Sequence, residues 1–101
     1  MAEKPESRLQ KKMQKRFRLR GAAVIKVHGG LYSSGIPDLL ACYRGIFVAC
    51  EVKTPQNKKG ATKLQRGVLK SIRRAGGYAY VIREEESVDR ILDAIDRRID
   101  G

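Results

Sequence analysis

The sequence predicts a single α/β domain in which helices flank a mixed four-stranded sheet. The chain has 101 residues, 42% of them hydrophobic, which suffices for one hydrophobic core and leaves no room for a second. Segments with apolar residues every three or four positions, typical of helices, alternate with short apolar runs, typical of strands. Their order is helix, strand, strand, strand, helix, strand and helix, which favours one α/β domain over residues 1–101.

A helix is predicted over residues 5–20, with Glu6 at the head of its apolar face. Two starts fit this helix: Pro5 at its first position, or a capping box made by Ser7 and Gln10. The next predicted elements are a strand over 22–27, a glycine-rich loop over 28–37, strands over 38–43 and 46–53, and a basic loop over 54–61. A second helix follows, capped by Thr62 and Gln65, with an apolar stripe of Leu64, Val68 and Ile72 and an end at Gly76 and Gly77. A strand over 78–83 and a last helix from Ser87 to Ile99 complete the chain.

The strongest hairpin signal is the pair Arg44 and Gly45 between two apolar runs. A two-residue turn fixes the register, because the numbers of opposed residues must then sum to 89. Asp38 is therefore expected opposite Glu51, with Cβ atoms ~4.5 to 5.5 Å apart on one face, close enough to hold one cation. Lys53 projects from the same face.

The same register separates the two cysteines. Cys42 falls on the face of Glu51 and Cys50 on the opposite face, so no disulfide can join them. Both faces are otherwise apolar, which predicts interior strands that are covered on both sides. One histidine and two cysteines cannot supply the four ligands of a zinc site, and a zinc or disulfide architecture is excluded.

The charge of the chain is strongly positive and unevenly distributed. There are 22 Lys and Arg against 11 Asp and Glu, a net charge of +11. Residues 1–83 hold 19 of the basic residues and only four acids, Glu3, Glu6, Asp38 and Glu51. Such a surface predicts a polyanionic partner, and nucleic acid is the commonest. Carboxylates kept within so basic a stretch predict a role in holding a metal or moving a proton.

Phosphate contacts are predicted for the basic loop and for the exposed face of the second helix, because no acid occurs over residues 52–83. A solvated face is the alternative interpretation. The candidate DNA-binding residues are Lys58, Lys59, Lys63, Arg66, Lys70, Arg73 and Arg74.

No apolar run reaches the ~18 residues of a membrane span, and the basic N-terminus has no apolar core of a secretory signal. We therefore expect an intracellular, cytoplasmic protein that does not contact membranes.

Three motifs occur in order: Gly35-Ile36-Pro37-Asp38, then Glu51-Val52-Lys53 after twelve intervening residues, then Gln65 on the following helix. Together with Glu6 on the first helix, they resemble the PD-(D/E)XK nuclease superfamily. The chain is most similar to its VRR-NUC branch, the virus-type replication-repair nuclease domain, over nearly its whole length. This resemblance implies a restriction-endonuclease-like fold and a metal-dependent endonuclease that hydrolyses phosphodiester bonds of DNA.

The resemblance also implies a metal site. Asp38, Glu51 and the backbone carbonyl of Val52 would hold Mg²⁺ or Mn²⁺, hard cations that prefer oxygen ligands. Glu6 would support a second metal or its waters, although an interaction with the helix dipole explains this residue equally well.

Two further residues complete the implied catalytic set. Lys53 would orient the nucleophile or stabilise the developing negative charge. Gln65 would position its neighbours, although a capping box alone explains a glutamine at this place.

Stand-alone phage enzymes of this branch act on four-way junctions as dimers, and the chain resembles them most. We therefore expect a structure-selective enzyme that cuts four-way (Holliday) junctions, working as a homodimer joined through its first or last helix. Flaps, nicks or ordinary duplex are alternative substrates. A basic module that binds nucleic acid without cutting it is the alternative outside the enzymes.

Overall fold

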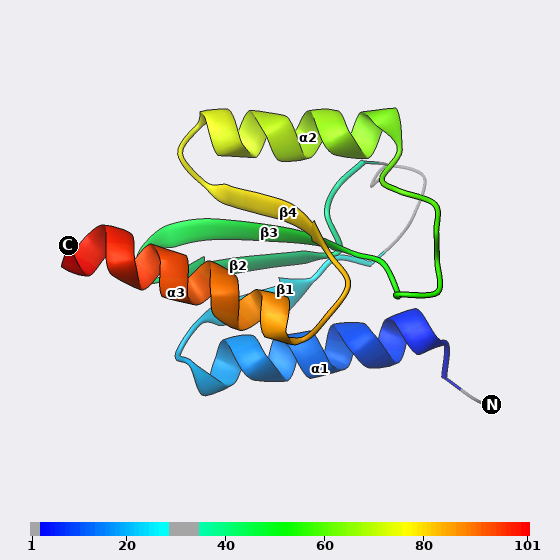
Figure 1. The fold of residues 1–101 in the computed structure, drawn as a ribbon, viewed down its shortest axis with the longest axis horizontal. Helices are drawn as coiled ribbons and strands as arrows, with labels where there is room; N and C mark the ends of the chain where they lie inside the picture. The colour runs from blue at the N-terminus through cyan, green and yellow to red at the C-terminus, as the bar shows by residue number, and fades with distance from the viewer. Residues whose placement is uncertain (1–2, 29–34) are drawn as a thin grey trace.

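The computed structural model describes residues 3–28 and 35–101, and within them three helices surround one sheet (Figure 1). The predicted order of elements is confirmed. In chain order they are α1 (Pro5–Leu19), β1 (Ala23–Lys26), β2 (Leu39–Tyr43), β3 (Ile46–Val52), α2 (Lys63–Arg74), β4 (Tyr78–Ile82) and α3 (Glu86–Asp100). Most of the predicted loop over 28–37 lies outside the described residues.

The sheet has the strand order β1-β2-β3-β4 and is mixed, as predicted. The pairs β1–β2 and β2–β3 are antiparallel, and β4 lies parallel to β3. In the central hairpin Tyr43 pairs with Ile46 and Leu39 with Cys50, so the predicted register is confirmed. Arg44 and Gly45 at its turn have φ of 50° and 81°, the left-handed conformation that a tight two-residue hairpin turn requires at both positions.

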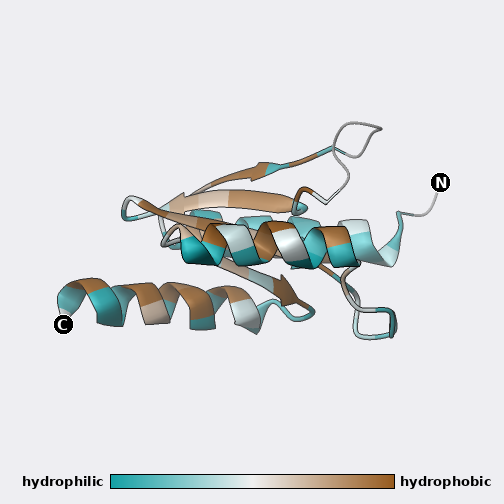
Figure 2. Ribbon diagram, turned by 90° about the horizontal axis from the view of Figure 1, so that it is seen from above, coloured by the Kyte–Doolittle hydropathy of each residue, from teal (hydrophilic) through white to brown (hydrophobic). Residues whose placement is uncertain are grey.

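Helices cover the two faces of the sheet unequally. Helices α1 and α3 lie against one face, and α2 lies against the other (Figure 1). Hydrophobic residues dominate the strands, whereas each helix alternates hydrophobic and hydrophilic residues (Figure 2). The main core lies between the sheet and the helix pair α1 and α3, and its largest fully buried side chains include Phe17, Met13, Leu39, Leu92, Ile95 and Val48.

The second face is only half covered. Ala49, Leu69 and Ala79 form a small core under α2, whose contacts are with β3 and β4. Phe47, by contrast, is 44% exposed and Ile25 on β1 is 66% exposed. The prediction that both hairpin strands are covered on both sides is therefore confirmed for the part of β3 beneath α2, and is wrong where Phe47 on β3 and Cys42 on β2 are exposed.

Of the two starts predicted for the first helix, the structure has the one at Pro5. Helix α1 begins at Pro5, with Lys4 as the preceding cap residue and without a side-chain cap. Proline fits the first helical position because its missing N–H has no partner there in any case. A capping box at Ser7 and Gln10 would lie inside this helix, so that alternative start is wrong.

Helix α2 starts as predicted but is rotated relative to the expected stripe. Thr62 and Gln65 form the reciprocal capping box. Leu69 is the buried residue of the helix, whereas Leu64 is 56% exposed. The expected stripe is therefore wrong at Leu64, whereas Ile72 packs against the small core as predicted and Val68 is half-buried. Gln65, in the same first turn as Leu64, reaches Glu51 at the end of β3.

Helix α3 begins one residue earlier than predicted. Its first residue is Glu86, and Ser87 lies inside the first turn instead of capping it. The Ser87 hydroxyl accepts a hydrogen bond from Arg90 at 3.0 Å. Glu86 and Asp89 occupy the first turn, where the helix dipole stabilises negative charge, and this favours the earlier start.

Acidic residues of α3 pair with arginines of α1 and of the hairpin turn. Arg20 is central, since it lies 2.8 Å from Asp93 and 3.0 Å from Asp96 and stacks on the ring of Tyr43 at 5.9 Å. The network consists of the pairs Arg16–Asp89, Arg20–Asp89, Arg20–Asp93, Arg20–Asp96, Arg44–Asp96 and Arg44–Asp100. The acids of the C-terminal segment thus neutralise arginines within the fold, and the lysines carry much of the remaining positive charge.

Within the ranges that the structure describes, no helix is long and apolar enough to cross a membrane.

We expect Arg20→Ala to lower the free energy of unfolding by about 1 to 2 kcal/mol, because it leaves Asp93 and Asp96 without a shared partner. Chemical denaturation at low salt should show this loss, and high salt should reduce it by screening the wild-type pairs. Arg18→Ala is the matched control. The Arg18 side chain is exposed and donates a long, 3.4 Å hydrogen bond to Gln14, so its removal should change stability by less than about 0.5 kcal/mol. Equal effects of the two substitutions would contradict a stabilising network.

Candidate functional site

Asp38 and Glu51 meet where β2 begins and β3 ends. Asp38 immediately precedes β2, and its Oδ2 accepts a hydrogen bond from the N–H of Val52 at 2.8 Å. This bond fixes the aspartate across the end of the hairpin, next to Glu51. The structure therefore brings together the two carboxylates that the register predicts.

Glu51 is a buried acid with one unsatisfied oxygen. Its side chain is 4% exposed. Its Oε2 accepts a hydrogen bond from Nε2 of Gln65 at 3.2 Å and lies 3.5 Å from Nζ of Lys53. Its Oε1 is buried and has no hydrogen-bond partner among residues 3–28 and 35–101. Because an unpaired buried oxygen is costly, this atom indicates a missing electrophilic partner such as a cation.

Electrostatics at the pair favour the same conclusion. Burial and, after it, the neighbouring Asp38 carboxylate together raise the pKa of the Glu51 carboxyl from 4.5 to about 7, against the opposing effect of Lys53. The single ammonium of Lys53 therefore compensates only part of the cost of two adjacent carboxylates. A divalent cation would stabilise the ionised form of both.

Lys53 and Gln65 approach Glu51 from different elements. The backbone N–H of Lys53 donates to the carbonyl of Ile82 at 3.0 Å, which extends the β3–β4 pairing and holds the lysine beside the acid. Gln65 has two functions at once, since its Oε1 accepts from the N–H of Thr62 at 2.8 Å while its Nε2 binds Glu51. The capping and positioning interpretations of this residue are therefore compatible.

The hydrogen bond of the Glu6 side chain is with a residue of its own helix and not with Asp38 or Glu51. Glu6 occupies the first turn of α1, and its Oε1 accepts a 3.5 Å hydrogen bond from the buried Gln10. Over residues 3–28 and 35–101, no three His, Cys, Asp or Glu side chains gather closely enough to hold a metal ion. A role of Glu6 in holding waters or a second metal stays a prediction.

The donor set fits a hard divalent cation. Asp38 and Glu51 offer carboxylate oxygens, and the main chain of Val52 lies at the same strand end. Mg²⁺ and Mn²⁺ favour such oxygen ligands, and Mg²⁺ typically keeps several waters, so two carboxylates are sufficient. The unpartnered Oε1 of Glu51 is the atom that such an ion would satisfy.

The predicted DNA-binding residues differ in whether their side chains already bind a main-chain carbonyl. Lys58 and Lys59 lie on the exposed loop between β3 and α2, and all five basic residues of α2 are exposed. Two of these five also donate to main-chain carbonyls: Arg66 to Ala61 at 2.6 Å and Arg73 to Ala79 at 2.5 Å. The group without such a bond is Lys58, Lys59, Lys63, Lys70 and Arg74.

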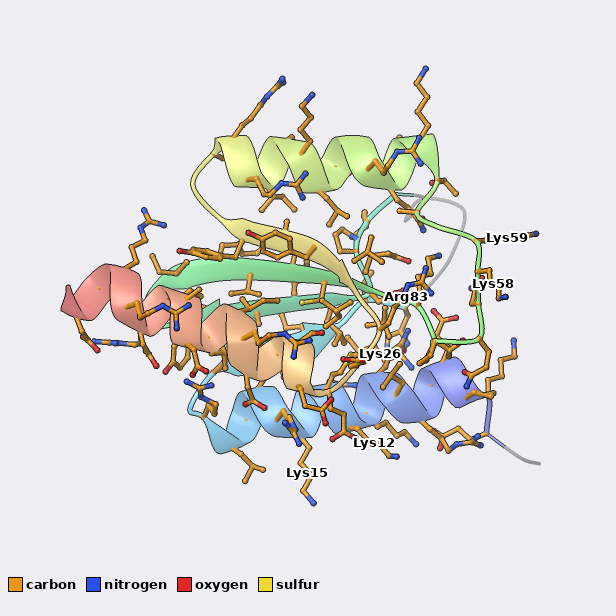
Figure 3. All side chains as sticks on the ribbon, viewed as in Figure 1. Lys12, Lys15, Lys26, Lys58, Lys59 and Arg83 are labelled. Atoms are coloured by element: carbon orange, nitrogen blue, oxygen red, sulfur yellow. The ribbon has the colours of Figure 1, made fainter. Side chains whose placement is uncertain are left out.

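Sequence reasoning missed basic residues close to the site. Lys26 pairs with Leu39 at the end of β1, next to Asp38, and continuation of the sheet register would have found it. Arg83 follows β4 and lies near the loop that carries Lys58 and Lys59 (Figure 3).

Known proteins similar to this chain were found among solved structures and family models. A solved structure described as a VRR_NUC domain superposes with a TM-score of 0.70 at 28% sequence identity, covering 87% of this chain and 94% of that chain. Among curated proteins no match is found. The family model described as archaeal Holliday junction resolvase (Hjc) matches residues 2–97. The predicted restriction-endonuclease-like nuclease domain is thereby confirmed, and the chain belongs to the archaeal Holliday junction resolvase (Hjc) family.

Proposed function

We propose that this nuclease is a divalent-metal-dependent endonuclease that cuts branched DNA, with four-way junctions as its substrate. The observation that carries the metal dependence is the buried Oε1 of Glu51, which has no partner although it lies beside a second carboxylate. The name of the family supports the junction as substrate. The net charge of +11 supports binding to a polyanion.

Each site residue has a proposed task. Asp38 and Glu51 hold Mg²⁺ or Mn²⁺, together with the Val52 carbonyl and with waters that Glu6 orients. When bound, such an ion supplies a Lewis acid for phosphodiester hydrolysis. Lys53 carries a positive charge to the reacting phosphate and stabilises negative charge that develops on it.

Gln65 and the exposed lysines act at the edges of this site. Gln65 orients Glu51 by its hydrogen bond to Oε2, which leaves Oε1 directed at the cation. Lysines on the β3–α2 loop and on α2 bind the DNA backbone through phosphates, which gives affinity without sequence readout.

Asp38→Asn or Glu51→Gln should lower the cutting rate more than about 100-fold, because even outer partners of metal ligands cost about 10- to 100-fold when removed. Binding should be retained or tightened, since a negative charge facing phosphate is lost. Labelled four-way, flap, nicked and linear DNA, incubated with Mg²⁺, Mn²⁺ or chelator, tests activity and substrate preference together.

The control for these variants is Glu84→Gln, because Glu84 is an exposed acid that pairs with Arg90 at 3.5 Å. It should cut like the wild type. Equal cutting of all DNA forms would contradict junction selectivity, and cutting in chelator would contradict the metal requirement. Binding without cleavage in every buffer would favour the non-catalytic module.

Metal should also change stability in a pH-dependent way. A carboxyl whose pKa is higher in the folded chain stabilises the fold below its ordinary pKa, here 4.5, and this contribution disappears as pH rises through about 7. In chelator, Glu51→Gln should therefore match the wild type at pH 5 and exceed it at pH 8. At pH 8, Mn²⁺ should raise the melting temperature of the wild type and hardly move the variant.

Thermal melts at both pH values, with and without Mn²⁺, decide this prediction. The expected difference is a few degrees, since 1 kcal/mol corresponds to about 4 to 8 °C in a domain of this size. If Glu51→Gln melts below the wild type in chelator at both pH values and Mn²⁺ shifts both equally, Glu51 is a structural residue.

We further propose that the enzyme acts as a homodimer. Its radius of gyration is 13.3 Å, small beside a branched junction, and two symmetric cuts need two sites. Sedimentation at working concentration should give twice the chain mass. A strict monomer that still cuts both strands of a junction would contradict this proposal.

A further inference from the structure

Arg83 gathers three carbonyl groups of one loop. It follows the last residue of β4, and the β3–β4 pairing continues through the bond from the Lys53 N–H to the Ile82 carbonyl. Its Nη1 donates to the carbonyls of Thr54 at 2.8 Å and Asn57 at 2.5 Å, and its Nη2 donates to that of Lys59 at 3.5 Å. The guanidinium therefore spans most of the loop 54–60.

This arginine is the polar link between the loop and the sheet. The hydrogen bonds within the described loop are local, from the N–H of Asn57 to Thr54 and from the N–H of Lys59 to the side chain of Asn57. Within the described part of the chain, hydrogen bonds that reach residues 54–60 from outside come from Arg83. Hydrogen bonding of the loop to the sheet thus runs through one side chain, and residues 54–56 also line a surface pocket together with residues of α1.

The loop starts and ends at the candidate active site. Lys53, directly before it, lies beside Glu51, and Gln65, shortly after it, binds the same acid. Lys58 and Lys59 are exposed, and neither forms an ion pair in the described structure. No acid occurs over residues 52–83, so their charge remains available to a phosphate.

We propose that Arg83 is a positioning residue for DNA binding, which fixes the loop between Lys53 and α2 so that Lys58 and Lys59 are held in place before DNA arrives. Its own charge is directed at main-chain carbonyls, while the two lysines extend from the loop (Figure 3). Ordering the lysines in advance removes an entropic cost that DNA binding would otherwise carry. The reading of these lysines as DNA contacts rests on the proposed function.

The geometry requires arginine. A planar guanidinium presents five donors in a fixed fork, whereas an ammonium is a compact point donor on a flexible stem. Arg83→Lys keeps the positive charge and most of the volume but cannot bridge three carbonyls. This substitution therefore separates positioning from simple charge, and a melting temperature near that of the wild type verifies folding; Arg83→Gln is the second variant.

The first measurement is limited trypsin digestion, with fragments identified by mass. Cleavage after Lys58 and Lys59 should be roughly tenfold faster in Arg83→Lys than in the wild type, because the loop opens more often. Arg90→Lys is the matched control, since Arg90 contacts Glu84 and Ser87 and not the loop. It should leave cleavage at these sites unchanged.

The second measurement is the affinity for a four-way junction in Ca²⁺. Arg83→Lys should weaken binding roughly tenfold by releasing two ordered side chains. Replacing Lys58 and Lys59 together by alanine should reduce the slope of the logarithm of the binding constant against the logarithm of the salt concentration by about 2. In that background Arg83→Lys should have almost no further effect, because the residues it positions are gone.

The outcomes separate this inference from the proposed function. The positioning role would be overturned if trypsin cleaved the loop of Arg83→Lys and Arg83→Gln no faster than that of the wild type. It would also be overturned if Arg83→Lys weakened junction binding as much in the Lys58 and Lys59 double variant as in the wild type. A wild type that binds junctions without cutting them would instead refute the proposed activity. The digestion and affinity measurements would still decide the role of Arg83 in that case.

Discussion

The register of the β2–β3 hairpin is the constraint on which the rest of the site depends. Two residues in the left-handed conformation, Arg44 and Gly45, close a turn whose register places Asp38, six residues before Arg44, across from Glu51, six residues after Gly45. A slip of one residue would move Glu51 to the face that holds Cys50 and the main core. The geometry of the acidic pair is therefore set by a turn at the opposite end of the hairpin.

Burying an acid pair at a strand end has an energetic cost that the surrounding fold must absorb. Helices α1 and α3 supply the large core on one face, and the arginine network joins them to the hairpin turn. Gln65 connects the start of α2 to Glu51, so that the helix position and the orientation of the acid depend on each other. Stability and site geometry are thus coupled through few side chains.

Local features were predictable from sequence, and contacts between distant segments were not. The hairpin register follows from a two-residue turn, and the α2 capping box follows from Thr62 and Gln65, because both depend on neighbours along the chain. The exposure of Leu64 depends on how α2 rotates over β3 and β4, which no local pattern encodes.

The contacts of Arg83 and of α3 show the same limit. Arg83 is separated from Thr54 by 29 positions, and Arg20 from Asp96 by 76. Charge counting indicated that the acids were confined to the end of the chain without showing which arginines they meet. The Asp38–Glu51 pair could be predicted from the sequence because one short turn joins its two strands. The hydrogen bond from the N–H of Val52 to Asp38 could be seen only in the structure.

The unequal covering of the sheet gives the two thiols different chemistry. Cys50 lies in the main core, and burial raises its pKa to about 12, whereas Cys42 is exposed on the half-covered face. The thiolate is the reactive form, so a maleimide dye would attach at Cys42 in the unaltered chain. The sequence holds only these two cysteines. A fluorescent reporter can therefore be installed on the sheet without engineering, at a defined distance from the acidic pair along one hairpin.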